Sequence, residues 1–379
     1  MQSTLAASGA LLALALGSVA ALAAPQPVYV AGLAYLGDYQ YADSNYALAR
    51  GLNAEDQALD RHVRAALEAL RPTHLELRFE LGDLDRTDTI VMAIALDRER
   101  VSRERFAFRQ GFRTKVIVEA SLQILFYDLA TGALVDNVPV SAAINHVLRD
   151  EDAIDAETKR LAEMLYLGDG EDQGLLVQAT AKLAAFSPRV ADGLRYQLAS
   201  FTLHERTLGV LPSGQSADQV LQSFGQSFSA RLAEQTPVSV IPFARGYAFG
   251  NQLPGRFSNG EVFNLQLPEP DYAFHVELKR LSKHEQDDQL IFLTQAFLRF
   301  VEPVTGRALV AGDYRTQVPK LASAARIESD DWSAYQDAVE ALFDSWIEQL
   351  KEPTRRWHTQ HAREKESFSQ FRKAGELFQ

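Results

Sequence analysis

The chain has 379 residues, no cysteine and a formal net charge of −12 at pH 7. The lack of cysteine excludes disulfides, thiolate metal sites and a cysteine nucleophile, and it argues against a lipid-anchored cysteine. The acidic balance argues against duplex nucleic acid as a main partner. Hydrophobic residues make up 46% of the sequence, which is typical of a folded globular protein.

The amino-terminal segment has the pattern of a secretory signal peptide. Residues 1–23 contain no charged side chain, and an apolar stretch runs from Leu11 to Leu22. Ala21-Leu22-Ala23 is a small-x-small cleavage pattern. We therefore expect cleavage after Ala23 and a periplasmic protein without a membrane-spanning helix. The alternative is an uncleaved anchor, which so short and alanine-rich a segment supports poorly.

Two stretches of the chain share one order of elements. Each is expected to open with a short strand, at residues 28–34 in the first stretch and 207–211 in the second. A helix with apolar residues at helical spacing follows, and then four strands and a closing helix. The expected closing helices span residues 154–167 and 332–350. The sequence therefore predicts an α/β protein with two tandem units, each a mixed sheet with helices packed on it.

A hairpin turn is the clearest signature of this repeat. In each unit an acidic residue, two further residues and a Thr-Gly pair stand between two β-rich runs. Glycine in such a place supplies the positive φ that a hairpin turn needs. We therefore assign the turn residues a structural role. They are Asp128, Thr131 and Gly132 in the first unit, and Glu302, Thr305 and Gly306 in the second.

These features divide the chain into five predicted segments. They are a signal peptide (1–23), a first α/β domain (24–167), a helical linker (168–205), a second α/β domain (206–350) and a charged C-terminal tail (351–379). The tail carries seven Lys/Arg and four Glu in a polar context. Such a composition predicts a solvated helix or an arm that binds a partner.

The element order and the Thr-Gly hairpins resemble those of the CsgG-like proteins of the bacterial envelope. The FlgT-like periplasmic proteins and the amino-terminal domain of TolB are similar in layout. The resemblance covers most of both units in element order, but its matching residues are only those of the two turns. It implies two tandem CsgG-like domains and a non-catalytic scaffold or assembly factor of a flagellar, secretion or surface-fibre machine. The missing cysteine sets this chain apart from the lipid-anchored members, so the FlgT-like proteins are the nearer analogue.

An arginine-rich stretch and an aromatic loop are the candidate partner-binding surfaces. We expect residues 98–115 to protrude and to bind an acidic partner or an anionic envelope polymer, whereas the alternative is a solvated hairpin. The glycine-flanked loop 246–260 is typical of interfaces, although local packing would also explain its aromatic residues. The candidates are Arg98, Arg100, Arg103, Arg105, Phe106, Arg109 and Arg113 in the stretch, and Tyr247, Phe249 and Phe257 in the loop.

No motif in the sequence indicates catalysis, a cofactor or a metal. Residues 209–216 stand where a phosphate-binding loop would, but Gln215 replaces its lysine and Pro212 removes an amide donor. We therefore predict no cofactor, no metal and no catalytic residue, with envelope proteins or a second copy of the chain as partners. Two alternatives stay open: a regulator of a peptidoglycan synthase, and a periplasmic glycan- or peptide-binding protein or hydrolase.

Overall fold

The structure is a computed structural model. It describes residues 25–37, 42–54, 56–80, 89–108, 111–149, 153–168, 174–186, 193–212, 215–243, 252–286, 289–321, 331–362 and 368–378. The predicted signal peptide, residues 1–23, lies outside these ranges. Within them, no helix is long and apolar enough to cross a membrane.

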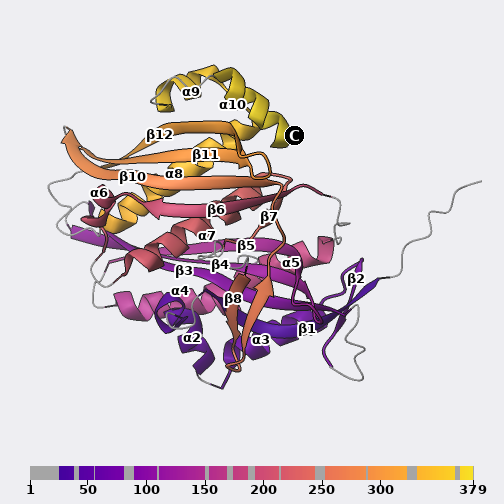
Figure 1. The fold of residues 1–379 in the computed structure, drawn as a ribbon. Helices are drawn as coiled ribbons and strands as arrows, with labels where there is room; N and C mark the ends of the chain where they lie inside the picture. Colours follow the sequence, from indigo (N-terminus) through magenta and orange to yellow (C-terminus); the bar gives the residue numbers. More distant parts are fainter. Residues whose placement is uncertain are drawn as a thin grey trace, which may run out of the picture.

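Two mixed sheets with helices packed on them form the molecule, as the sequence predicts (Figure 1). Sheet 1 has the strand order β5-β4-β3-β1-β8-β9, and β2 also pairs with β1. Sheet 2 has the order β12-β11-β10-β6-β7. The strands of sheet 1 are β1 (Gln26–Leu36), β2 (Leu75–Arg78), β3 (Ile90–Phe108), β4 (Gly111–Asp128), β5 (Leu134–Leu148), β8 (Gln252–Phe257) and β9 (Val262–Gln266). The strands of sheet 2 are β6 (Arg195–Leu203), β7 (Ser239–Ile241), β10 (Tyr272–Gln286), β11 (Gln289–Glu302) and β12 (Arg307–Leu321).

The helices of each unit cover one face of that unit's own sheet. Those of the first unit are α1 (Ala42–Asn45), α2 (Ala47–Ala54), α3 (Ala58–Ala69), α4 (Ile154–Leu167) and α5 (Leu175–Ala185). The stripe of Leu59, Val63 and Leu67 on α3 is buried with apolar residues of β3 and β4, as its spacing predicts. The second unit has α6 (Glu205–Leu208), α7 (Ala217–Gln235) and α8 (Asp331–Lys351). A capping box formed by Ser216 and Gln219 begins α7.

The helices α7 and α8 lie between the two sheets (Figure 1). Their apolar faces pack on sheet 2, where Phe228, Phe343 and Trp346 are buried with Phe274. α7 also contacts β3 and β5 of sheet 1. The layers therefore follow one another as helices, sheet 1, helices and sheet 2, so that the second unit stacks on the first.

The opening strand of the second unit differs from the prediction. Residues 207–211 form the end of α6 and a turn rather than a strand. The opening strand is β6, and it lies within residues 168–205, which the sequence predicts to be a helical linker. Tyr196 and Leu198 of β6 are both buried in the core on α7 and α8. Leu194 and Leu198 are spaced as on a helix, whereas Tyr196 and Leu198 are spaced as on one face of a strand. Tyr196 and Leu198 both face the core, so the segment is a strand.

The repeat extends to the irregularities of strand pairing. β3 has a one-residue bulge at Asp97 opposite β4, and β10 has one at Lys279 opposite β11. The residues before these bulges, Leu96 and Leu278, pair with the ends of β1 and β6. Two further register shifts, one between β1 and β3 and one between β4 and β5, also recur in the second unit. Each residue near the bulge of one sheet therefore has a defined counterpart in the other.

A hairpin from the second unit completes sheet 1. β8 and β9 follow β7 in the chain, yet β8 pairs antiparallel with β1 of the first unit. Leu253 and Leu265 of this hairpin are buried with Ala93 and Ala95 on the face of sheet 1 that points away from α3. Small alanine side chains let the hairpin approach this face closely. The two units are interlocked by it.

The C-terminal tail, residues 351–379, is neither a solvated helix nor a free arm. It forms α9 (Arg355–His361), α10 (Phe368–Gly375) and a 3₁₀ turn (Glu376–Phe378). Phe371 and Phe378 are buried in the core on sheet 2, and the Tyr196 hydroxyl donates to the Leu377 carbonyl over 2.8 Å. The prediction is wrong because it considers the charged residues of the tail and not its apolar residues, which pack against α8 and β12.

Candidate functional site

Two of the predicted binding arginines lie at a buried junction between the units. Arg98 and Arg100 belong to β3, and only 11% and 5% of their side chains are exposed. Arg98 donates to Glu340 of α8 over 2.6 Å, and Arg100 donates to Asp337 over 3.0 Å. Arg231 of α7 also donates to Glu340, over 2.8 Å. These two arginines therefore bind the second unit of their own chain and do not form the protruding surface that the sequence predicts.

Glu340 is the centre of this junction. Burial would raise the pKa of its carboxyl, but Arg98, Arg231 and Arg100 together lower that pKa to about 2. The carboxylate is therefore charged at neutral pH and balances guanidinium groups from both units. A buried carboxylate held this way is costly to remove, because its cationic partners would stay buried without it.

Further polar contacts widen the junction. Lys320 of β12 donates to Glu104 of β3 and to Asp337 of α8, each over 2.8 Å. On the other side, Ser141 of β5 donates to Glu234 of α7 over 2.8 Å. This contact zone is polar and charged, and so resembles an interface between proteins more than the core of a domain.

The other candidate side chains of the β3–β4 hairpin are held locally. Arg103 is 47% exposed and pairs with Asp155 at the start of α4 over 2.8 Å. The Arg105 guanidinium lies 4.4 Å from the ring centroid of Phe112, and Arg113 donates to the Phe112 carbonyl over 2.7 Å. These arginines thus lie on the hairpin as predicted, but each is engaged in a local ion pair, ring contact or hydrogen bond.

The remaining aromatic candidates contribute little to a common surface. Phe257 lies in β8, where its ring centroid is 4.7 Å from that of Phe263 and the pair packs on the core. This is the local packing that the sequence leaves open as an alternative. Arg109, Tyr247 and Phe249 lie outside the described residues, as does the side chain of Phe106.

The two Thr-Gly turns have matching hydrogen bonds. The Thr131 hydroxyl donates to the Asp128 carboxylate over 2.6 Å, and the Thr305 hydroxyl donates to Glu302 over 2.6 Å. The glycine after each threonine has a φ of 67° or 68°. Glycine adopts such a φ at little steric cost, which explains why the pair recurs at both turns.

A polar cleft lies beside the junction, with a cavity of about 540 Å³. Its walls carry many side-chain amides, among them those of Gln219, Gln222 and Gln336. Asp97 and Glu99 also line it, and burial raises the pKa of both, although each carboxyl accepts hydrogen bonds that oppose this rise. Those donors come from the protein itself, so the two acids serve the structure of the cleft.

The face of sheet 2 that points away from α7 and α8 is uncovered by any helix in the described part of the chain. Arg280, Arg299 and Gln317 are exposed on it. Leu293 and Phe297 of β11 stand among these polar residues, half-buried by their neighbours. We call this surface the open face.

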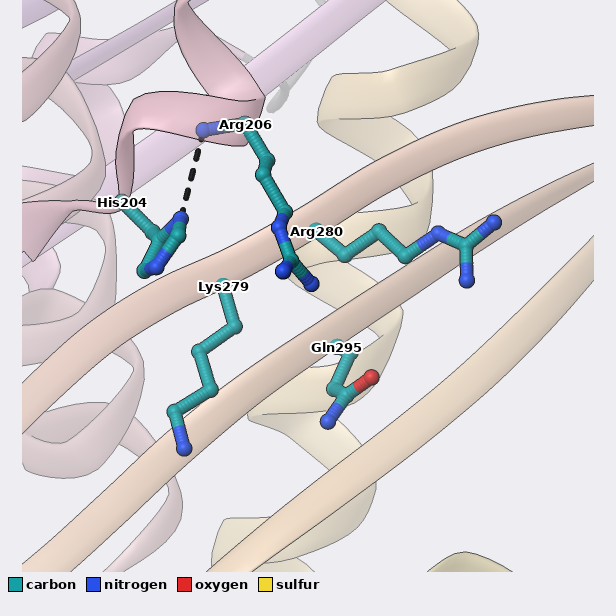
Figure 2. A pocket seen from close by; sticks show the side chains of 5 residues that line it. All are labelled: His204, Arg206, Lys279, Arg280 and Gln295. Carbon is teal, nitrogen blue, oxygen red and sulfur yellow. Dashed lines mark hydrogen bonds between the residues drawn. The ribbon is translucent and has the colours of Figure 1, made fainter.

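A cationic pocket lies at one end of the open face, with a volume of about 300 Å³ (Figure 2). Arg206 reaches it from α6, Lys279 and Arg280 from the bulge of β10, and Gln295 from β11. His204 caps α6 through a hydrogen bond that its ring accepts from the Arg206 backbone N–H, over 3.2 Å. Lys279 is paired with Asp313 over 2.9 Å. Such a pocket can bind carboxylates or other anions by charge-assisted hydrogen bonds.

The sequence analysis misses this pocket because its members are spread from residue 204 to residue 295. Neither the strand β6 nor its junction with α6 is predicted, so His204 and Arg206 are not placed beside β10. One available signal is the pair Lys279-Arg280, which follows Leu278 just as Asp97-Arg98 follows Leu96 in the repeat. That alignment would have placed both pairs at the same bulge.

Comparisons with known proteins find distant similarity to solved structures over part of the chain. No protein-family model and no curated protein matches the chain. A minor lipoprotein from Acinetobacter baumannii is 12% identical, with a TM-score of 0.24, over 42% of this chain and 91% of that one. A DUF330 protein from Xanthomonas campestris is 10% identical, with a TM-score of 0.24, over 42% of this chain and 81% of that one.

Proposed function

We propose that this protein is a non-catalytic scaffold of the bacterial envelope that binds another protein through the open face of sheet 2. The carrying observation is a difference between counterparts. Leu293 and Phe297 on the open face stand where Glu119 and Gln123 stand on the face of sheet 1 that α7 and α8 cover. At these two positions the uncovered face carries apolar side chains where the covered face carries polar ones, and apolar side chains on an uncovered face favour docking of a partner.

Other features support a scaffold role in the envelope. The predicted signal peptide and the resemblance to CsgG-like proteins favour the periplasm and protein–protein binding. The buried acids Asp97 and Glu99 are occupied by hydrogen bonds within the fold, which favours a structural over a catalytic use.

Site-specific crosslinking in living cells tests this proposal. A photoreactive amino acid replaces Gln317, which is exposed on the open face, or Val304, which is 92% exposed at the tip of the β11–β12 hairpin. We expect illumination to join a second protein to the chain from position 317 and not from position 304. The same products from both positions, or none from position 317, would contradict the proposal.

A second candidate function is glycan binding in the polar cleft, and the amide-rich wall favours it. Glutamine side chains both donate to and accept from sugar hydroxyls. Titration with oligomers of N-acetylglucosamine, followed by calorimetry, tests it. Binding that Gln222→Ala weakens would support this function, and no heat at millimolar ligand would exclude it for this glycan.

A further inference from the structure

The cationic pocket on sheet 2 and the buried junction on sheet 1 occupy equivalent places in the repeat. Arg98 and Arg280 each follow the one-residue bulge of their strand. Arg98 lies opposite Ser121 of β4, and Arg280 lies opposite Gln295 of β11. Arg280 is therefore the counterpart of Arg98, so the contacts of Arg98 indicate what this position is built to bind.

In sheet 1 this position binds an acidic helix. Asp337, Glu340 and Asp344 lie three and four residues apart on α8, which places them along one side of the helix. Glu340 pairs with Arg98, Asp337 pairs with Arg100, and Asp344 pairs with Arg231. Two carboxylates of this row thus meet arginines of β3 at and after its bulge, and the third pairs with Arg231 of α7.

In sheet 2 the same position has its cations in place without such a helix. Arg206 and Arg280 are both exposed, and in the described parts of the chain neither forms an ion pair with a carboxylate. These two charges stand out on a protein whose net charge is −12. Leu293 and Phe297 extend the surface along β11, so that a cationic end adjoins an apolar strip.

We propose that the open face docks an acidic helix of a partner protein. Carboxylates at positions i, i+3 and i+7 of that helix pair with Arg206 and Arg280, and apolar residues beside them cover Leu293 and Phe297. This proposal rests on the proposed function, because it states the chemistry of the partner at the same surface.

A second copy of this chain fits the open face less well. The stacking of units would place the helices of the first unit there, and those helices carry a mixed surface. Arg61 and Arg64 of α3 and Arg160 of α4 accompany the acidic Glu68 and Asp155. Their cations would face Arg206 and Arg280, and like charges at close range oppose binding.

A designed helical peptide tests the chemistry directly. The probe is an alanine-rich helix with glutamates at i, i+3 and i+7, a leucine row beside them and a fluorescent label. Its matched control has glutamine in place of glutamate. Fluorescence anisotropy with the full mature chain should show the glutamate peptide binding at least about tenfold more tightly, and binding should weaken as salt rises from about 0.05 to 0.5 M. Equal affinity for the two peptides would overturn the proposal.

Charge-reversal variants assign the binding to the pocket. R206E and R280E should each lower the affinity for the glutamate peptide at least about tenfold, because each replaces an attraction with a repulsion. R299E is the matched control, since Arg299 is exposed on the same face outside the pocket. An equal loss in R299E would mean that the charge of the whole face attracts the peptide, and the proposed pocket would be wrong.

Crosslinking from position 317 separates this proposal from the function on which it rests. If the product forms in the unaltered chain and disappears in the R206E/R280E double variant, both are supported. A product that persists in the double variant leaves the scaffold function standing and overturns the acidic helix. A product with twice the mass of the chain would identify a second copy as the occupant, and this would also overturn the acidic helix. The absence of any product in the unaltered chain would contradict the scaffold function itself.

Discussion

The faces of the two sheets that point away from the helices of their own unit occupy the same place in the repeat, but one is covered and the other is open. On sheet 1, Glu119 pairs with Arg100 and Gln123 accepts from Asn137 within the sheet. The contact of this face with the helices is made by Arg98 with Glu340 of α8 and by Ser141 with Glu234 of α7. On sheet 2, Leu293 and Phe297 hold the corresponding positions and face outward. The difference teaches that α7 and α8 meet sheet 1 through specific polar pairs, whereas apolar side chains hold the two corresponding positions on the face that the chain leaves open.

This arrangement fixes the geometry of the internal junction. A polar interface gains little from area alone, so its geometry depends on the placement of a few ions. The open face has the reverse properties, because apolar residues tolerate small shifts of a partner. We therefore expect substitutions at the junction to change the stability of the protein and substitutions on the open face to change its binding.

The largest expected effect is that of Glu340→Ala. The substitution leaves Arg98, Arg100 and Arg231 around a site without its carboxylate, and removal of one member of a buried ionic group costs about 3–5 kcal/mol. Urea denaturation of the purified protein measures the loss. The matched control is Glu68→Ala, which removes an exposed pair with Arg64 and should cost no more than about 0.5 kcal/mol.

The acid limb of the stability curve checks the same residue. The pKa of Glu340 in the folded protein, about 2, lies below its ordinary value of 4.5. Its contribution to stability is therefore complete above about pH 4.5 and is lost as pH falls toward about 2. This part of the acid destabilisation should be missing in Glu340→Ala. An acid curve parallel to that of the unaltered protein would contradict the electrostatic account of the junction.

The next largest effect on stability is expected when Gln123 and Phe297, which hold equivalent positions in the two sheets, each receive the residue type of the other. Gln123 is 3% exposed, donates to Asp97 over 2.8 Å and accepts from Asn137 over 2.9 Å. Gln123→Phe overfills this site and removes both bonds, at a cost of about 1–3 kcal/mol. Phe297→Gln on the open face should cost less than about 1 kcal/mol, mainly the loss of a contact with Lys279. Comparable losses from the two denaturation curves would show that the faces do not differ as described.

A smaller effect, of opposite sign, is expected at Asp97. Burial raises the pKa of this carboxyl although Ser121 and Gln123 donate to it. A group of this kind stabilises the fold at low pH and loses that contribution as pH rises through its folded pKa, so at pH 7 the charged form is unfavourable. Asp97→Asn removes the charge; its amide oxygen still accepts from Gln123, and its NH2 group donates to the Ser121 hydroxyl in place of the bond it loses. The free energy of unfolding at pH 7 should therefore rise, and the gain should shrink below about pH 4.

The control for Asp97 is the same substitution at an exposed acid. Hydrogen bonds from Thr131 lower the pKa of Asp128 in the first hairpin turn. Asp128→Asn should therefore reduce stability at pH 7, in contrast to Asp97→Asn. Two shifts of the same sign in parallel titrations would refute the assignment of burial as the cause at Asp97.

The smallest effect on stability is expected for Arg280→Glu. The residue is exposed, so the substitution should change the free energy of unfolding by no more than about 0.5 kcal/mol. At the counterpart, Arg98→Glu places a second carboxylate beside Glu340 and should cost several kcal/mol. Thermal unfolding of the two variants side by side measures the contrast, and similar melting temperatures would break it.

The parts of the fold that the sequence predicts are those with a local signal. The α4 helix has the predicted bounds, the α7 cap lies at Ser216, and each Thr-Gly hairpin lies between two long strands. Such features depend on spacing within about 20 residues. β6 was not predicted, because a bulge at its middle interrupts the alternation that marks a strand.

The candidate site could be predicted only in part, since its character depends on distant contacts. The arginines of β3 are visible in the sequence, but their burial depends on Glu340, 240 residues from Arg100 along the chain. No local pattern in the sequence shows whether the basic residues of β3 or those of β10 contact the acidic helix α8. The open face could be recognised only after the two sheets were matched residue by residue.

The β8–β9 hairpin has a consequence for how the chain is assembled. β1 is made near the start of synthesis, but its pairing partner β8 is separated from it by roughly 220 residues. Sheet 1 therefore keeps an unpaired edge until synthesis reaches β8 in the second unit. A nascent or truncated chain that ends before residue 252 presents that edge to other strands, so the first unit depends on a late segment for protection against premature association.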